Sequence, residues 1–179
     1  KTDSVAIEVL VRVGSDYENA TNRGITHFIE HMVFEGTKRR DARELANAIE
    51  RIGGEINAVT SQEKTFFYAI VPRQHFRLAL EVLADILIYP VFDEQAIAKE
   101  KHVVLDEIAL LHDDPMHFTW IQLMATLFER LLVRYPTYGS AALIRRFTKK
   151  QLLAFFRKHY VARNTIVSIV GGVRDPFGA

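Results

Sequence analysis

Hydrophobic and polar positions alternate along the chain in a way that predicts four short strands. β-branched residues dominate residues 5–13, which predicts a strand that stops at Gly14. Residues 55–60 and 65–71 have the same character and are joined by a short polar turn. Residues 164–170 predict the last strand, which a Gly-Gly pair follows.

Apolar residues that recur every three or four positions predict helices between these strands. The predicted helices span residues 25–34, 41–52, 72–88, 93–112, 117–132 and 152–160. Capping-box patterns precede two of them, Asp-Ala-Arg-Glu at 41–44 and Thr-Lys-Lys-Gln at 148–151. The segments contain neither a linker nor a repeat. We therefore expect an α+β fold, with the helices packed on one face of a largely antiparallel sheet.

The predicted helix at residues 25–34 carries three polar side chains in an otherwise apolar sequence. At about 100° per residue, His31 lies about 40° from His27, and Glu30 lies about 60° to the other side. The three side chains therefore share one face. Burying such groups without partners costs roughly 1–3 kcal/mol each, and more for a charge, so this face needs a partner.

The predicted helix at residues 93–112 places Glu100 and Glu107 only about 20° apart around its axis. They share a stripe with the apolar residues Ile97, Val104, Ile108 and Leu111. Two carboxylates in a core-facing stripe repel each other unless a cation compensates. Two histidines and one glutamate form a ligand set for catalytic zinc. We expect the two helices to pack around one metal; the alternative is a metal-free hydrogen-bonded network of histidines and carboxylates.

Composition narrows the function classes. The chain has 179 residues, 49% of them hydrophobic, which suits one domain with a substantial core. Its net charge of +1 gives no electrostatic case for binding nucleic acid or an anionic membrane. No run approaches the roughly 18 apolar residues of a membrane span. Because the chain has no cysteine, any metal must be held by nitrogen and oxygen.

Three segments carry a resemblance to a known family. They are GITHFIEHMVFEGT, GGEINAVTSQEKTFFYAIV and EKHVVLDEIALLHDDP, and the first contains the inverted zincin signature His-x-x-Glu-His. In order and spacing, over residues 5–173, the chain resembles the N-terminal catalytic half of the pitrilysin superfamily, of the bacterial type. This superfamily of zinc peptidases includes insulin-degrading enzyme and mitochondrial processing peptidase. The resemblance implies a pitrilysin-type half-domain and a zinc metalloendopeptidase that hydrolyses extended peptides or small unfolded proteins.

The same resemblance implies a role for each polar residue of the two helices. His27, His31 and Glu107 would hold one Zn²⁺ per chain, and Glu30 would be the general base. Glu100 would accept a hydrogen bond from a ligand imidazole and so fix its tautomer.

Substrate contacts are implied for the predicted strand at residues 55–60. A peptide would pair with this strand at the edge of the sheet, in contact with Asn57 and Ala58. Phe67 and Tyr68 are expected to serve strand packing, although a side-chain pocket is an alternative for them.

The chain departs from the family pattern at its two ends. Members usually begin with an additional strand and carry a second, metal-free homologous half that closes over the zinc. We therefore expect residues 1–179 to be a single catalytic-type domain that lacks both, and that works with a homologous half or subunit, or as a homodimer.

Two further features of the sequence bear on the predicted function. The mitochondrial enzyme has acidic residues at the positions of His117 and Ile121, so a peptidase of the bacterial cytoplasm or periplasm is favoured. A catalytically silent structural or regulatory subunit is the alternative function, but such subunits generally lose the zinc residues that are intact here.

The remaining histidines are expected to be solvated or to cap helices: His75, His102, His112, His117 and His159.

Overall fold

The fold is built on one four-stranded sheet. A computed structural model describes residues 3–173. The strands are β1 (Ser4–Val11), β2 (Glu55–Thr60), β3 (Thr65–Pro72) and β4 (Thr165–Gly171). Their order is β2-β3-β1-β4, and every neighbouring pair is antiparallel. β2 and β4 are therefore the two edge strands.

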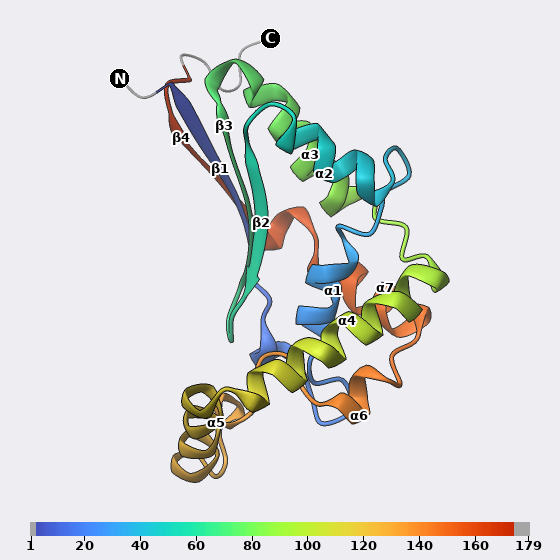
Figure 1. Ribbon diagram of the computed structural model, residues 1–179, viewed down its shortest axis with the longest axis vertical. Helices are drawn as coiled ribbons and strands as arrows, with labels where there is room; N and C mark the ends of the chain where they lie inside the picture. The colour runs from blue at the N-terminus through green and yellow to red at the C-terminus, as the bar shows by residue number, and fades with distance from the viewer. Residues whose placement is uncertain (1–2, 174–179) are drawn as a thin grey trace.

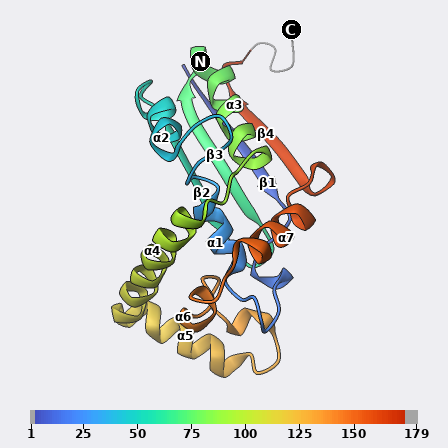
Figure 2. The ribbon, with the colours of Figure 1, turned by 90° about the vertical axis from the view of Figure 1, so that its right-hand side faces the viewer.

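The helices cover one face of this sheet, as the sequence predicts (Figure 1). They are α1 (Ile25–Met32), α2 (Ala42–Glu50), α3 (Phe76–Ile88), α4 (Glu94–Asp113), α5 (Pro115–Leu127), α6 (Ala141–Ile144) and α7 (Lys149–His159). The side view shows α1 between α4 and α7, while α5 lies beyond the end of the sheet (Figure 2). The expected α+β fold is confirmed. Within residues 3–173, no helix has the length and apolar character needed to cross a lipid bilayer.

Local hydrogen bonds explain most helix boundaries. Both predicted capping boxes form, because Asp41 and Thr148 each accept from the backbone N–H three residues later. Several boundaries differ from the prediction, most of all the end of α5, which lies at Leu127 and not at residue 132. A 3₁₀ turn at Arg73–His75 delays the start of α3, and α5 begins earlier than expected because Pro115 occupies its first turn.

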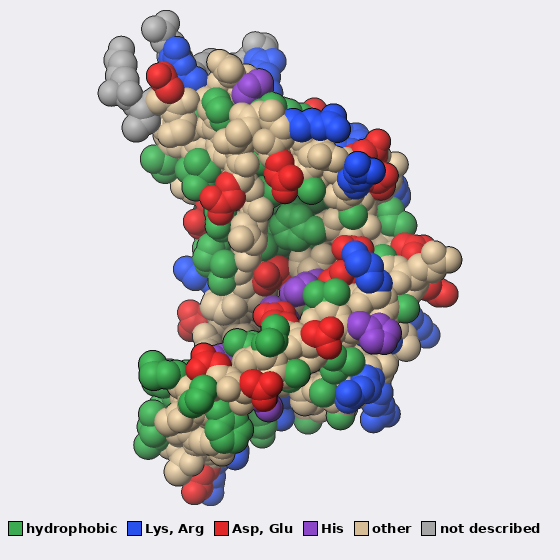
Figure 3. All heavy atoms as spheres, in the orientation of Figure 1, with side chains coloured by type: hydrophobic (Ala, Val, Ile, Leu, Met, Phe, Trp, Pro, Cys, Tyr) green, Lys and Arg blue, Asp and Glu red, His purple; other side chains and the backbone are tan. Residues whose placement is uncertain are grey.

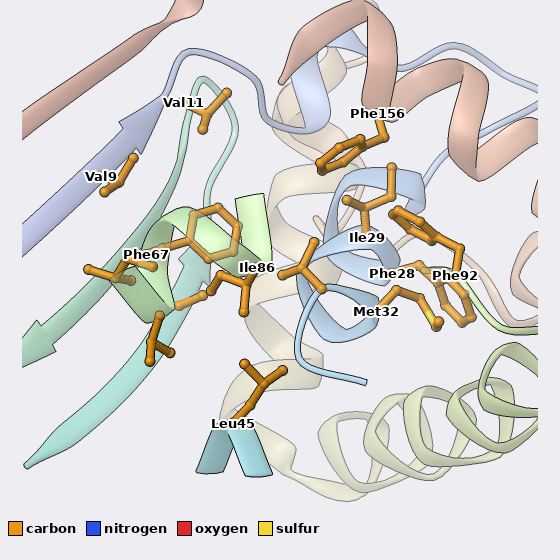
Figure 4. Packing of buried hydrophobic residues seen from close by; sticks show 14 of the residues in the cluster. Val9, Val11, Phe28, Ile29, Met32, Leu45, Phe67, Ile86, Phe92 and Phe156 are labelled. Atoms are coloured by element: carbon orange, nitrogen blue, oxygen red, sulfur yellow. The ribbon is translucent and has the colours of Figure 1, made fainter. Parts of the chain in front are cut away.

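The core lies between the sheet and the helices. Alternate residues of β1 are buried, which places Val5, Ile7, Val9 and Val11 in the core. In Figure 4, Phe28 and Ile29 of α1 lie beside Phe92 and Phe156, whose ring centroids are 5.4 Å apart. Phe67 is fully buried and its ring packs against Phe34. The core therefore holds α1 firmly, and the pocket alternative for Phe67 is wrong.

Candidate metal centre

The start of α1 is fixed by an unusual cap. Gly24 has the left-handed backbone conformation (φ 89°), and it has no side chain to cap the helix. The carboxylate of Glu18 replaces that cap, because it accepts from the N–H groups of Gly24 and Thr26 at 2.8 Å each. Burial raises the pKa of Glu18 to about 7, although both hydrogen bonds act in the opposite direction.

Packing of α1 against α4 brings two histidines and a carboxylate together. The Nε2 of His27 lies 3.7 Å from one oxygen of Glu107, and the Nε2 of His31 lies 3.5 Å from the other. One ligand atom from each of the three residues lies within 4.8 Å of the others. Ligand atoms about 2.1 Å from a tetrahedral zinc are roughly 3.4 Å apart. The two nitrogen–oxygen separations are therefore close to this value, and the three donor groups lie near enough to one another to share an ion.

Glu100 contacts the second ring nitrogen of the His31 imidazole, the one that does not face Glu107. Its Oε2 lies 3.2 Å from the Nδ1 of His31, and its side chain is 7% exposed. When Nδ1 carries the hydrogen of this bond, Nε2 presents its lone pair towards Glu107. The Nδ1 of His27 is buried and has no hydrogen-bond partner among residues 3–173. A neighbouring acceptor therefore orients one imidazole and not the other.

The charges around the three residues suit a cation. Burial alone would lower the pKa of His31, but the hydrogen bonds to Glu100 and Glu107 outweigh it and raise that pKa to about 9. Burial lowers the pKa of His27, and the charge of His31 adds to this effect. The hydrogen bond to His31 lowers the pKa of Glu107. A proton on His31 thus balances the carboxylates here, and a divalent cation can replace it.

Glu30 lies beside this group but is held from another direction. Its Oε2 accepts a hydrogen bond from the hydroxyl of Thr60, at the end of β2. Burial raises the pKa of Glu30, against the effect of this hydrogen bond. A carboxyl group of raised pKa next to a metal-type ligand set is suited to accept and release a proton.

A cavity of about 340 Å³ opens in front of these residues. His27, Glu30 and Glu107 form its polar side, and Ala58 and Thr60 bring the edge strand β2 to it. The rest of the lining from α4, α5 and the segment before α6 is mainly apolar and aromatic, with His117 and Arg134 among it: Leu111, Trp120, Ile121, Met124, Tyr135 and Tyr138. Acidic and histidine side chains gather where the surface is hollowed between the sheet and α4 (Figure 3). Asn57 is exposed on β2, and its Oδ1 accepts from the N–H of Ala58 at 2.8 Å.

Sequence reasoning misplaced several residues near this cavity. Glu107 is not core-facing, since 39% of its side chain is exposed. His117 lines the cavity, half-buried, with its Nε2 3.4 Å from the hydroxyl of Tyr138. His159 is half-buried against Phe155, with ring centroids 4.5 Å apart. Both histidines are partly covered by their neighbours: His159 is less solvated than expected, because its Nε2 is buried, whereas His117 remains in contact with the open cavity.

Known proteins that resemble this chain in sequence or in fold are named as proteases or peptidases. The model of the insulinase family, peptidase family M16, matches residues 1–140. Over 171 residues the chain is 41% identical to an uncharacterized zinc protease of Rickettsia felis, covering 96% of this chain and 42% of that protein. It is 35% identical to a probable mitochondrial-processing peptidase subunit beta of Arabidopsis thaliana, covering 96% of this chain and 32% of that one. A crystal structure of a Helicobacter pylori protease superposes with a TM-score of 0.92 at 28% identity, covering 97% and 42% of the two chains.

The fold and these relatives show that the chain is a domain of the zinc protease class. The chain belongs to the insulinase family, peptidase family M16, and the resemblance found in the sequence is confirmed. It spans less than half the length of the relatives it matches.

Proposed function

We propose that the chain is the metal-binding half of a zinc metalloendopeptidase that hydrolyses extended peptides or small unfolded proteins. The observation that carries this proposal is the convergence of two imidazole nitrogens and a carboxylate beside a cavity that Glu30 also lines. His27, His31 and Glu107 would hold one Zn²⁺ per chain, since their separations suit that ion and all three are nitrogen or oxygen donors.

The chain's own residues would handle the protons of the reaction. Bound zinc would lower the pKa of water and polarise the scissile carbonyl. Glu30 would accept a proton from the attacking water and deliver it to the leaving amine. Glu100 would retain the Nδ1 proton of His31 and so keep its Nε2 available as a donor.

The substrate would bind as an additional strand. β2 is an edge strand and lines the cavity through Ala58 and Thr60, so a peptide paired with it would pass Glu30 and Glu107. Backbone pairing supplies affinity without demanding a particular sequence. Asn57 and Ala58 would contact this peptide, the side chain of Asn57 giving up its bond to the N–H of Ala58.

A second element would complete the site. The cavity is open to solvent on this chain, and the chain covers only 42% of its bacterial relative. We therefore propose that a homologous half or subunit, or a second copy of the chain, closes over the cavity and excludes water from it.

Metal content and hydrolysis of a fluorogenic extended peptide test this function together. The chain should bind about one zinc, Glu107→Gln should lose it, and Glu30→Gln should keep it but lose hydrolysis. Glu94→Gln, an exposed change in the first turn of α4, is the matched control and should behave as the parent. Failure of the folded chain to bind added zinc would refute the metal site. Zinc without hydrolysis, even beside the homologous second half, would instead support a catalytically silent subunit.

A further inference from the structure

We propose that Thr60 is a positioning residue that orients the carboxylate of Glu30 for proton transfer. This inference rests on the proposed function, because it assigns Thr60 a part in the action of the proposed base. The hydroxyl of Thr60 donates to the Oε2 of Glu30, and the two residues are 30 positions apart in the chain.

The hydroxyl of Thr60 is the donor in this hydrogen bond. Thr65 faces Thr60 across the β2–β3 pair, with the two hydroxyl oxygens 3.4 Å apart. The hydroxyl of Thr65 donates its single hydrogen to the carbonyl of Val13 at 2.9 Å. Thr60 therefore receives no hydrogen from Thr65, and because the ionised carboxylate of Glu30 has none to donate, the hydrogen of the Thr60–Glu30 bond comes from Thr60.

This hydrogen bond has a consequence for the two carboxylate oxygens. The terminal torsion of a glutamate is broad, so an unpartnered carboxylate samples many orientations. The donor from Thr60 occupies Oε2 and leaves Oε1 as the oxygen that takes the proton from water. A catalytic group that is held in the productive orientation accelerates a reaction more than one that is free to rotate.

The position of Thr60 in the fold adds a second consequence. Thr60 is the last residue of β2, the edge strand with which a peptide would pair, and it lines the same cavity as Glu30. The same strand would therefore hold the peptide backbone and the proposed base.

Thr60→Val removes the hydroxyl and nearly keeps the side-chain shape, and Thr60→Ser restores the hydroxyl. In the zinc-loaded protein with its second half, we expect Thr60→Val to lower kcat about tenfold, with KM and zinc content unchanged. Thr60→Ser should retain most of the parent kcat. Thr165→Val is the matched control, because Thr165 is a half-buried strand residue whose hydroxyl donates to Val161 at the other edge of the sheet. A parent-like kcat in Thr60→Val, or an equal loss in Thr60→Ser, would overturn the proposal.

A measurement without turnover separates this inference from the proposed function. The ¹³C resonance of the Glu30 carboxyl carbon, assigned by its loss in Glu30→Gln, reports the hydrogen bond at one fixed pH. We expect it to move in Thr60→Val and to stay at the parent position in Thr60→Ser and Thr165→Val. An unchanged resonance in Thr60→Val would reject the role of Thr60 even in an active enzyme. If the parent fails to hydrolyse peptides, the proposed function falls while this measurement still decides whether Thr60 holds Glu30.

Discussion

Replacing Glu18 by Gln tests how the start of α1 is held. Glu18 is only 6% exposed, and its two oxygens accept from two backbone N–H groups. Gln has one acceptor oxygen, so one of those buried donors loses its partner at a cost of about 1–3 kcal/mol. The variant also removes a buried carboxyl group that titrates, and this second effect changes with pH.

The sign of the pH effect follows from the direction of the pKa shift. Burial raises the pKa of Glu18 from 4.5 to about 7, so the folded state holds a proton that the unfolded state releases. The stability that Glu18 contributes is therefore full below about pH 4.5 and is lost as the pH rises through 7. Between pH 5 and pH 8 the loss amounts to about 2.5 kcal/mol.

Urea unfolding in a chelating buffer at pH 5 and pH 8 measures this difference without a contribution from bound metal. The parent should lose about 2.5 kcal/mol more than Glu18→Gln over this interval. Glu50→Gln, an exposed change at the end of α2, controls for the loss of a carboxylate elsewhere. Equal losses in the parent and in Glu18→Gln would refute the reasoning, since the two N–H donors would then fully offset the burial.

Two further predictions concern α1 and its neighbours. Glu100→Gln weakens the acceptor that holds the Nδ1 hydrogen of His31, so zinc affinity should fall about 10- to 100-fold in a chelator competition, and an unchanged affinity would exclude this role. Gly24→Ala should lower the melting temperature markedly, because the residue has φ 89° and an added Cβ would lie 2.5 Å from the carbonyl oxygen of Tyr138. Gly53→Ala is its control, since that glycine also has a positive φ but a Cβ there meets no atom within 4 Å, so an equal loss would assign the effect to backbone conformation alone.

Local patterns predicted the elements well because each depends on residues close together in the chain. The capping boxes at Asp41 and Thr148 satisfy helix N–H groups three residues away, and both form. The alternating burial of β1 follows from the period of a strand in the same way. The short helix α6 has too few residues for a periodic signal, and the sequence did not predict it.

Glu18 and Thr60 hold the site from outside α1 and α4, and no local sequence pattern predicted either contact. Glu18 lies six and eight residues from the N–H groups that it accepts, in a segment without regular structure. Thr60 meets Glu30 only because β2 packs beside α1. One indirect signal existed for Glu18, since α1 begins at a glycine and so needs a cap from elsewhere.

The sequence by itself determined which chemical groups share a helix face, because the helical period places His27, Glu30 and His31 together wherever that helix lies. The same period left Glu100 and Glu107 equivalent, two carboxylates on one stripe. The family resemblance implied different roles for them, and the tertiary structure supplies the physical reason: α4 packs on α1 so that Glu107 meets the Nε2 atoms and Glu100 meets the Nδ1 of His31. That assignment depends on the packing of two helices more than sixty residues apart in the chain, which no local pattern encodes.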